Sequence, residues 1–154
     1  EDNAWIAANL RREAEARGIE GARLVFAGRL PMEEHLARQR CADLFLDTFN
    51  VNAHTTASDA LWVGLPVLTR LGSSFAARVA GSLLHAVGLP ELATESDEAY
   101  EALAYELATA PARLAEIRMR LAANRTSAPL FDTALFTRNI EQAFEAIVAE
   151  HSTS

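Results

Sequence analysis

The chain has 154 residues, the size of one domain, with half of them hydrophobic and 23% charged. This balance is typical of a globular protein with a core of its own and excludes a disordered tail. A formal net charge of −7 argues against non-specific binding to nucleic acid or to an anionic membrane. No apolar run is long enough for a membrane span.

The cysteine content gives an expectation about the compartment. Cys41 is the single cysteine, so the chain can form no internal disulfide. A chain without disulfides suits a reducing environment, and the first residues of the sequence have neither the basic region nor the apolar core of a signal peptide. We therefore expect a cytoplasmic protein.

The first part of the chain predicts two helices and two strands. Residues 3–17 alternate apolar and charged side chains as an amphipathic helix does, and Gly18 would end that helix. A short apolar run over residues 24–27 predicts a buried strand. Residues 32–40 predict a helix, because acidic residues come first and basic residues later, as the helix dipole favours. Residues 44–49 predict the second strand.

A polar loop over residues 50–54 then leads into a predicted helix over residues 55–63, which Gly64 would end. Residues 66–69 predict the third strand, and a helix over residues 75–87 follows it. From about residue 96 onwards the sequence predicts helices over residues 97–109, 111–124 and 132–150.

Strands that alternate with helices predict an α/β fold with a short parallel sheet, followed by C-terminal helices. Three strands are few for such a sheet, because the mean sheet has about five or six. Further strands are expected upstream of residue 1, and the sequence also lacks an initiator methionine. We therefore expect the chain to be an excerpt of a longer protein.

The strongest candidate site is the segment that enters the helix at residue 55. In open parallel sheets, ligands bind beyond the carboxyl ends of the strands, and a helix N-terminus offers N–H groups to phosphate. His54, Thr55 and Thr56 would add side-chain donors there. The alternative is that Thr55 or Thr56 only caps the helix, with Asp59 completing a capping box. On spacing alone, the capping role is the stronger interpretation.

A second candidate lies at the start of the helix over residues 32–40. His35 and Arg38 are three residues apart and share a helix face. The imidazole could stack on a nucleotide base, and the guanidinium could bond the carbonyls of that base. The alternative is a solvated helix face, which the residues alone favour.

Other chemistries fit the sequence poorly. It contains no G-x-G-x-x-G, no P-loop and no G-x-S-x-G elbow, and it lacks the paired cysteines or H-E-x-x-H of a zinc site. Asp47 ends a predicted strand and could be catalytic, although a strand-end aspartate often bonds nearby loop backbone instead. We expect His85, on an apolar predicted helix, to be a core or surface histidine and His151, near the terminus, to be exposed. We expect no metal and no cofactor.

Several motifs, in order and spacing, closely resemble the C-terminal catalytic lobe of O-GlcNAc transferases, and of their bacterial members in particular. The resemblance extends roughly over residues 19–150. The segments that carry it are residues 29–35 (RLPMEEH), 41–48 (CADLFLDT), 52–56 (NAHTT), 59–67 (DALWVGLPV), 75–84 (FAARVAGSLL) and 127–132 (SAPLFD).

The resemblance implies a GT-B fold, in which two Rossmann-like lobes face a cleft. Residues 1–95 would then form an incomplete Rossmann-like lobe that binds a nucleotide sugar, and residues 96–154 a helical segment packed on the same lobe. The roles that the resemblance implies concern UDP: His54, Thr55 and Thr56 hold the diphosphate, Asp59 bonds the ribose, and His35, Arg38 and the backbone near Leu30 bind the uracil.

The implied reaction is the inverting transfer of GlcNAc from UDP-GlcNAc to Ser or Thr hydroxyls of a protein acceptor. The catalytic base, the N-terminal lobe and tetratricopeptide repeats would lie outside this chain. Met32 departs from the family, which often has a lysine there that touches the ribose. A donor such as GDP-fucose or UDP-glucose therefore remains an alternative, and so does a non-catalytic nucleotide-binding lobe.

Overall fold

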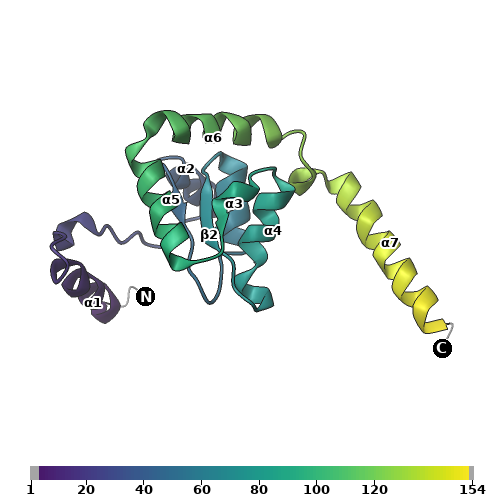
Figure 1. Cartoon of the computed structure of the whole chain (residues 1–154), viewed down its shortest axis with the longest axis horizontal. Coiled ribbons are helices and arrows are strands. Elements are labelled where there is room, and N and C mark those ends of the chain that lie inside the picture. The colour runs from purple at the N-terminus through teal and green to yellow at the C-terminus, as the bar shows by residue number, and fades with distance from the viewer. Residues whose placement is uncertain (1–3, 153–154) are drawn as a thin grey trace. The chain divides into compact units, whose positions relative to one another are not determined.

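The computed structural model describes residues 4–152, and the chain divides into two compact units between His35 and Leu36. The first unit contains α1 (Ala4–Glu15) and a short 3-10 helix, η1 (Gly21–Arg23). The helix α2 (Met32–Gln39) begins in the first unit and ends in the second. All the strands of the described chain belong to the second unit (Figure 1).

The first unit confirms the amphipathic helix but not the strand that was predicted after it. Gly18 has a φ of 77°, and the N–H of Ile19 donates to the carbonyl of Ala14 at 3.0 Å, so the chain turns out of α1 at this glycine. Residues 24–27 belong to no strand or sheet, and Val25 is 87% exposed. The predicted strand is wrong here, because an apolar run becomes a strand only when a neighbouring strand pairs with its backbone.

The second unit is built on a parallel sheet of three short strands in the order β1-β2-β3. Phe45 of β1 (Phe45–Leu46) pairs with Val67 of β2 (Val67–Arg70). Thr69 of β2 pairs with Ala93 of β3 (Ala93–Thr94). The strands predicted over residues 44–49 and 66–69 are confirmed with narrower or shifted bounds. The strand β3 was not predicted, because two residues are too few to show an apolar pattern.

The helices of the second unit follow the predicted order closely. The single helix predicted over residues 75–87 is divided into a 3-10 turn and α4. The remaining bounds are α3 (Thr55–Val63), η2 (Phe75–Ala77), α4 (Val79–Ala86), η3 (Pro90–Leu92), α5 (Asp97–Thr109), α6 (Pro111–Asn124), η4 (Pro129–Phe131) and α7 (Thr133–Ser152).

The core of the second unit lies around β2, on which α3, α4 and α5 all pack (Figure 1). Val67 and Leu68 of β2 are fully buried. Leu107 of α5 and Leu121 of α6 belong to the same hydrophobic core as the buried residues of α3 and α4. The helices α5 and α6 therefore share the core of the sheet and complete it.

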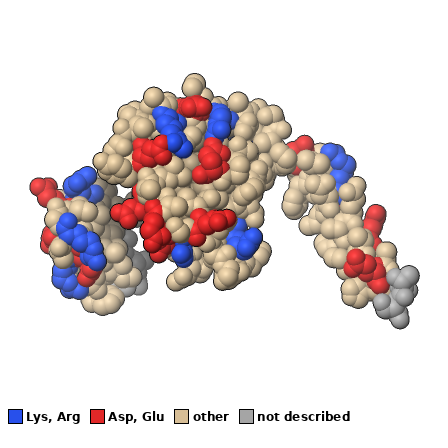
Figure 2. Space-filling model, viewed as in Figure 1, with Lys and Arg blue, Asp and Glu red and all other residues tan. Residues whose placement is uncertain are grey.

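On the face shown in Figure 2, basic and acidic side chains lie interspersed and form no continuous basic surface. Among the described helices, none is both long enough and apolar enough to cross a bilayer.

Candidate functional site

The segment between β1 and α3 follows the carboxyl end of a parallel strand, where α/β proteins hold their ligands. Asp47 comes directly after β1 and is only 4% exposed. Residues 48–53 form a loop, and α3 begins at Thr55. The local geometry of the site is therefore decided by how this loop is held.

The carboxylate of Asp47 holds the loop at both of its ends. Its Oδ1 accepts the backbone N–H of Thr48 at 2.8 Å and that of Ala53 at 2.7 Å. Its Oδ2 accepts the hydroxyl of Thr69, on the neighbouring strand β2, at 2.6 Å. All three bonds use the side chain as an acceptor, so Asp47 serves as a structural anchor. This outcome fits the interpretation that the aspartate bonds nearby loop backbone.

Side chains within the loop add further bonds. The Thr48 hydroxyl donates to the carbonyl of Val51 at 2.7 Å, and the amide of Asn52, a residue only 4% exposed, donates to the carbonyl of Thr48 at 3.0 Å. The backbone N–H of Asn52 donates to the carbonyl of Ala76 at 2.8 Å, which ties the loop to the turn before α4. The loop is thus bonded within itself and to two neighbouring segments.

An aromatic pair covers the loop on the side of α5. The rings of Phe49 and Tyr100 meet edge to face with centroids 5.0 Å apart, and the guanidinium of Arg70 lies 4.8 Å from the centroid of Phe49. The hydroxyl of Tyr100 donates to the carbonyl of Asp47 at 3.0 Å. Burial raises the pKa of Tyr100 above its ordinary value, and the negative charge of Asp47 adds to this rise. Sequence reasoning missed Thr69 and Tyr100, which are distant along the chain.

His54 occupies the N-cap position of α3, and its side chain makes no capping bond to the helix. The interpretation in which Thr55 or Thr56 caps the helix is therefore wrong, because both threonines lie inside its first turn. A helix leaves the N–H groups of its first turn without intrahelical acceptors. His54 does not cap the helix with its imidazole, so its side chain accepts no hydrogen bond from the N–H groups of the first turn of α3.

The side chains at this helix start are accessible to a ligand. His54, Thr55 and Thr56 are exposed, while Asp59 is half-buried. Thr55 and Asp59 are four residues apart on α3 and share a helix face. Nε2 of His54 lies 3.4 Å from the carbonyl oxygen of Ala76, so the turn before α4 limits how the imidazole lies. The structure brings these four predicted residues together within one helical turn and a half.

The second set of predicted residues lies on and before α2. His35 and Arg38 are both half-buried, and their spacing on α2 places them on a common face. Leu30 precedes the helix and is 38% exposed, and Met32 at the first position of the helix is 60% exposed. Leu30 and His35 belong to the first compact unit, whereas Arg38 and α3 belong to the second.

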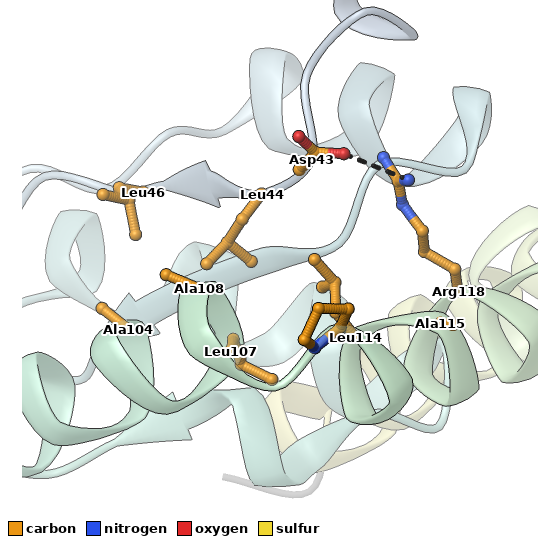
Figure 3. Close-up of a pocket in the computed structure, with 10 residues that line it drawn as sticks. Asp43, Leu44, Leu46, Ala104, Leu107, Ala108, Leu114, Ala115 and Arg118 are labelled. Carbon is orange, nitrogen blue, oxygen red and sulfur yellow. Dashed lines mark ion pairs between the residues drawn. The ribbon is translucent and has the colours of Figure 1, made fainter.

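A cavity of about 620 Å³ lies elsewhere, beside the edge strand β1. Figure 3 shows Leu44 and Leu46 on one side of it and side chains of α5 and α6 on the other, with the ion pair between Asp43 and Arg118 at its end. Its lining is mainly apolar and includes none of the predicted site residues. Within residues 4–152, no three His, Cys, Asp or Glu side chains are grouped as metal ligands.

The fold and the site together define an α/β lobe that presents a helix N-terminus at the carboxyl edge of a parallel sheet, the arrangement by which such lobes hold phosphate-bearing ligands. Comparison with known proteins specifies the kind of lobe. The sequence model of glycosyl transferase family 41 matches residues 4–140 of this chain. The chain belongs to this family.

Two curated relatives are similar over most of the chain. A UDP-N-acetylglucosamine–peptide N-acetylglucosaminyltransferase of Caenorhabditis elegans is 38% identical over 133 residues, which are 86% of this chain and 12% of that protein. A probable enzyme of the same name from Arabidopsis thaliana is 38% identical over 135 residues, or 87% of this chain and 14% of that protein. The chain thus spans about an eighth of the length of these relatives.

A solved structure confirms the fold. A mutant of the O-GlcNAc transferase of Thermobaculum terrenum is similar with a TM-score of 0.85 and 34% sequence identity, over 92% of this chain and 27% of that one. The α/β arrangement with a short parallel sheet and C-terminal helices is therefore that of a GT-B lobe of an O-GlcNAc transferase, as the sequence resemblance predicted.

Proposed function

We propose that this chain is the donor-binding part of an inverting protein O-GlcNAc transferase, an enzyme that moves GlcNAc from UDP-GlcNAc to Ser or Thr hydroxyls. The observation that carries the proposal is the accessible start of α3, where His54, Thr55 and Thr56 stand after a loop anchored by a buried carboxylate. The names of the relatives, which specify UDP-N-acetylglucosamine and peptide, support the same donor and acceptor.

The chemistry of the reaction explains what this helix start would do. An acceptor hydroxyl attacks the anomeric carbon of the sugar, the bond to the phosphate oxygen breaks, and UDP leaves with a growing negative charge. Backbone N–H groups at the start of α3, the hydroxyls of Thr55 and Thr56 and the imidazole of His54 are donors that stabilise such charge. Asp59, one turn further along the helix, would accept a hydrogen bond from the ribose. These donors would take the place of a metal ion.

The base contacts are proposed from the sequence resemblance and from the spacing on α2. His35 would stack on the uracil, Arg38 would bond its carbonyls, and the backbone near Leu30 would read its edge. Met32 occupies the first position of α2 and supplies no charge for the ribose. A donor with another base or sugar, such as GDP-fucose or UDP-glucose, is the second candidate, but the names of the relatives favour UDP-GlcNAc.

The remaining parts of the proposed enzyme lie in other segments of the full protein. The general base, the N-terminal lobe that faces this one, the acceptor cleft and any tetratricopeptide repeats are not among the residues of this chain. We place the enzyme in the cytoplasm, because the single cysteine, Cys41, is exposed and free. A non-catalytic nucleotide-binding lobe would use the same nucleotide site but would need no cleft for a protein acceptor.

Binding measurements test the proposal directly. The full-length protein should bind UDP in calorimetric titrations more tightly than GDP. In the His54→Ala variant the Kd for UDP should rise by about tenfold, because a bond to a charged group is lost, while the Kd for uridine should stay the same. His85→Ala is the matched control, since His85 is an exposed histidine on α4 that bonds its own helix.

Three results would speak against the proposal. Absence of UDP binding at millimolar concentration would remove the donor site altogether. Equal losses for UDP and uridine would contradict a diphosphate role for His54. Tighter binding of GDP than of UDP would favour the second donor.

A further inference from the structure

We propose that Asp47 is a positioning residue for the diphosphate-binding groups, and this inference rests on the proposed function of the α3 start. Asp47 itself touches no part of the predicted binding surface, since it is buried behind the loop. It acts through the backbone of Ala53, the residue directly before His54. Its effect on binding is therefore an effect on where His54 and the first N–H groups of α3 point.

The geometry shows why one carboxylate can control the helix entry. A single oxygen, Oδ1, accepts the N–H groups of Thr48 and Ala53, which are the two ends of the loop, at 2.8 and 2.7 Å. The loop is thereby closed on one atom, and the Asn52–Ala53 peptide group, one residue before His54, cannot rotate without breaking its bond to Oδ1. His54 is held at φ −100° and ψ −91°, the step that turns the loop into α3.

The second oxygen connects this closed loop to the rigid part of the sheet. Oδ2 accepts the hydroxyl of Thr69 at 2.6 Å, and the carbonyl of Thr69 accepts the hydroxyl of Thr94 on β3 at 3.1 Å. Both threonines are buried. A chain of hydrogen bonds therefore runs from β3 through β2 to the loop, and charge-assisted bonds in such buried surroundings are the strong ones.

Asparagine at position 47 would test the positioning of the loop without changing the packing of the core. Asp47→Asn keeps the size of the side chain, but one of its two terminal atoms becomes an amide nitrogen, which donates and cannot accept. Its oxygen can still face the two loop N–H groups, but the amide nitrogen then faces the Thr69 hydroxyl, which can no longer donate to this side chain, and the bonds to the loop lose their charge assistance. The bonds that close the loop are therefore weaker, while the apolar core around β2 keeps its contacts.

The test uses the full-length protein and two readouts. For Asp47→Asn the Kd for UDP should rise by about tenfold, whereas the Kd for uridine should change by less than about twofold. Hydrogen exchange, followed by mass spectrometry with UDP absent, should become faster in a peptide covering residues 48–56. Thr69→Val should show both effects in weaker form, and Thr69→Ser, which keeps the hydroxyl, should behave as the wild type. Tyr100→Phe is the control within the same network, because it removes a bond to the backbone of Asp47 and leaves the carboxylate in place.

The outcomes separate this inference from the function on which it rests. Faster exchange with weaker UDP binding supports positioning by Asp47. Unchanged exchange in Asp47→Asn overturns it, whatever the ligand results are. Equal losses for UDP and uridine also overturn it, because they indicate a general loss of folding. If the wild type binds no UDP, the proposed donor site fails, and the exchange data alone decide whether Asp47 fixes the helix entry.

Discussion

At the scale of single residues, the titration of Tyr100 can be measured, and it reports on Asp47, the residue that anchors the loop of the candidate site. Burial is the larger cause of the raised pKa of Tyr100, and the negative charge of Asp47 is the smaller one. The neutral phenol is therefore favoured in the folded state. Because ionisation is easier in the unfolded chain, the free energy of unfolding should fall as the pH rises above the ordinary value of 10.0 and approaches the pKa of the folded state.

The titration of Tyr100 can be measured in the Tyr105→Phe variant. The chain has two tyrosines, so Tyr100 is then the remaining one. The absorbance of tyrosinate should then report a pKa above 10.0. Adding Asp47→Asn should lower this pKa without returning it to the ordinary value, because the burial remains. An unchanged pKa would show that the charge of Asp47 is not felt at the phenol. The chain contains no lysine, so no ammonium group titrates in the same range.

At the scale of elements, the end of α3 is as well defined as its start. Gly64 has a φ of 88°, and its N–H donates to the carbonyl of Leu61 at 3.2 Å. The next residue, Leu65, is buried and donates to the carbonyl of Ala60 at 2.9 Å. This left-handed turn ends α3 and sends the chain directly into β2.

Replacing Gly64 therefore tests the turn that joins α3 to β2. Gly64→Ala should lower the free energy of unfolding by about 1 kcal/mol, because a Cβ disfavours the left-handed region. The space around the glycine is open, so a steric clash with neighbours does not contribute. Gly64→Asn is the matched variant and should lose less, since asparagine tolerates this region better. Urea unfolding measures both, and a larger loss for asparagine would argue against the conformational explanation.

At the scale of the whole molecule, α7 differs from the other helices of the second unit. The large side chains of Phe136, Phe144 and Val148 are all mainly exposed, although their spacing is that of an apolar helix face. The core cluster includes residues up to Phe131 but none from α7. Within the described residues, α7 therefore adds no residue to the buried core of the lobe.

Truncation distinguishes the helices that complete the core from the one that does not. A chain that ends after Asp132 should keep the midpoint of thermal unfolding to within a few degrees, because no buried side chain is removed. A chain that ends after Ala110 should fail to unfold cooperatively, because Ile117 and Leu121 of α6 leave the core. A large loss from the first truncation would show that α7 packs on the lobe in solution. Circular dichroism at increasing temperature measures both.

The sequence by itself determined the helices and the local residues of the candidate site. The helix bounds over residues 55–63, 97–109 and 111–124 were predicted as they are observed, because each helix carries its own start and stop signals. His54, Thr55 and Thr56 were found because a polar loop that enters a helix is visible over a few residues. The family was also recognisable from short motifs in a fixed order.

Only the tertiary structure decided which strands form and what holds the site. Residues 24–27 look like a strand but have no partner to pair with, whereas Ala93–Thr94 forms one because β2 lies beside it. The anchoring of the loop by Asp47 depends on Thr69, which is 22 residues away, and on Tyr100, which is 53 residues away. A helix is bonded within its own segment, but strands and buried polar side chains need partners that only the folded chain brings to them.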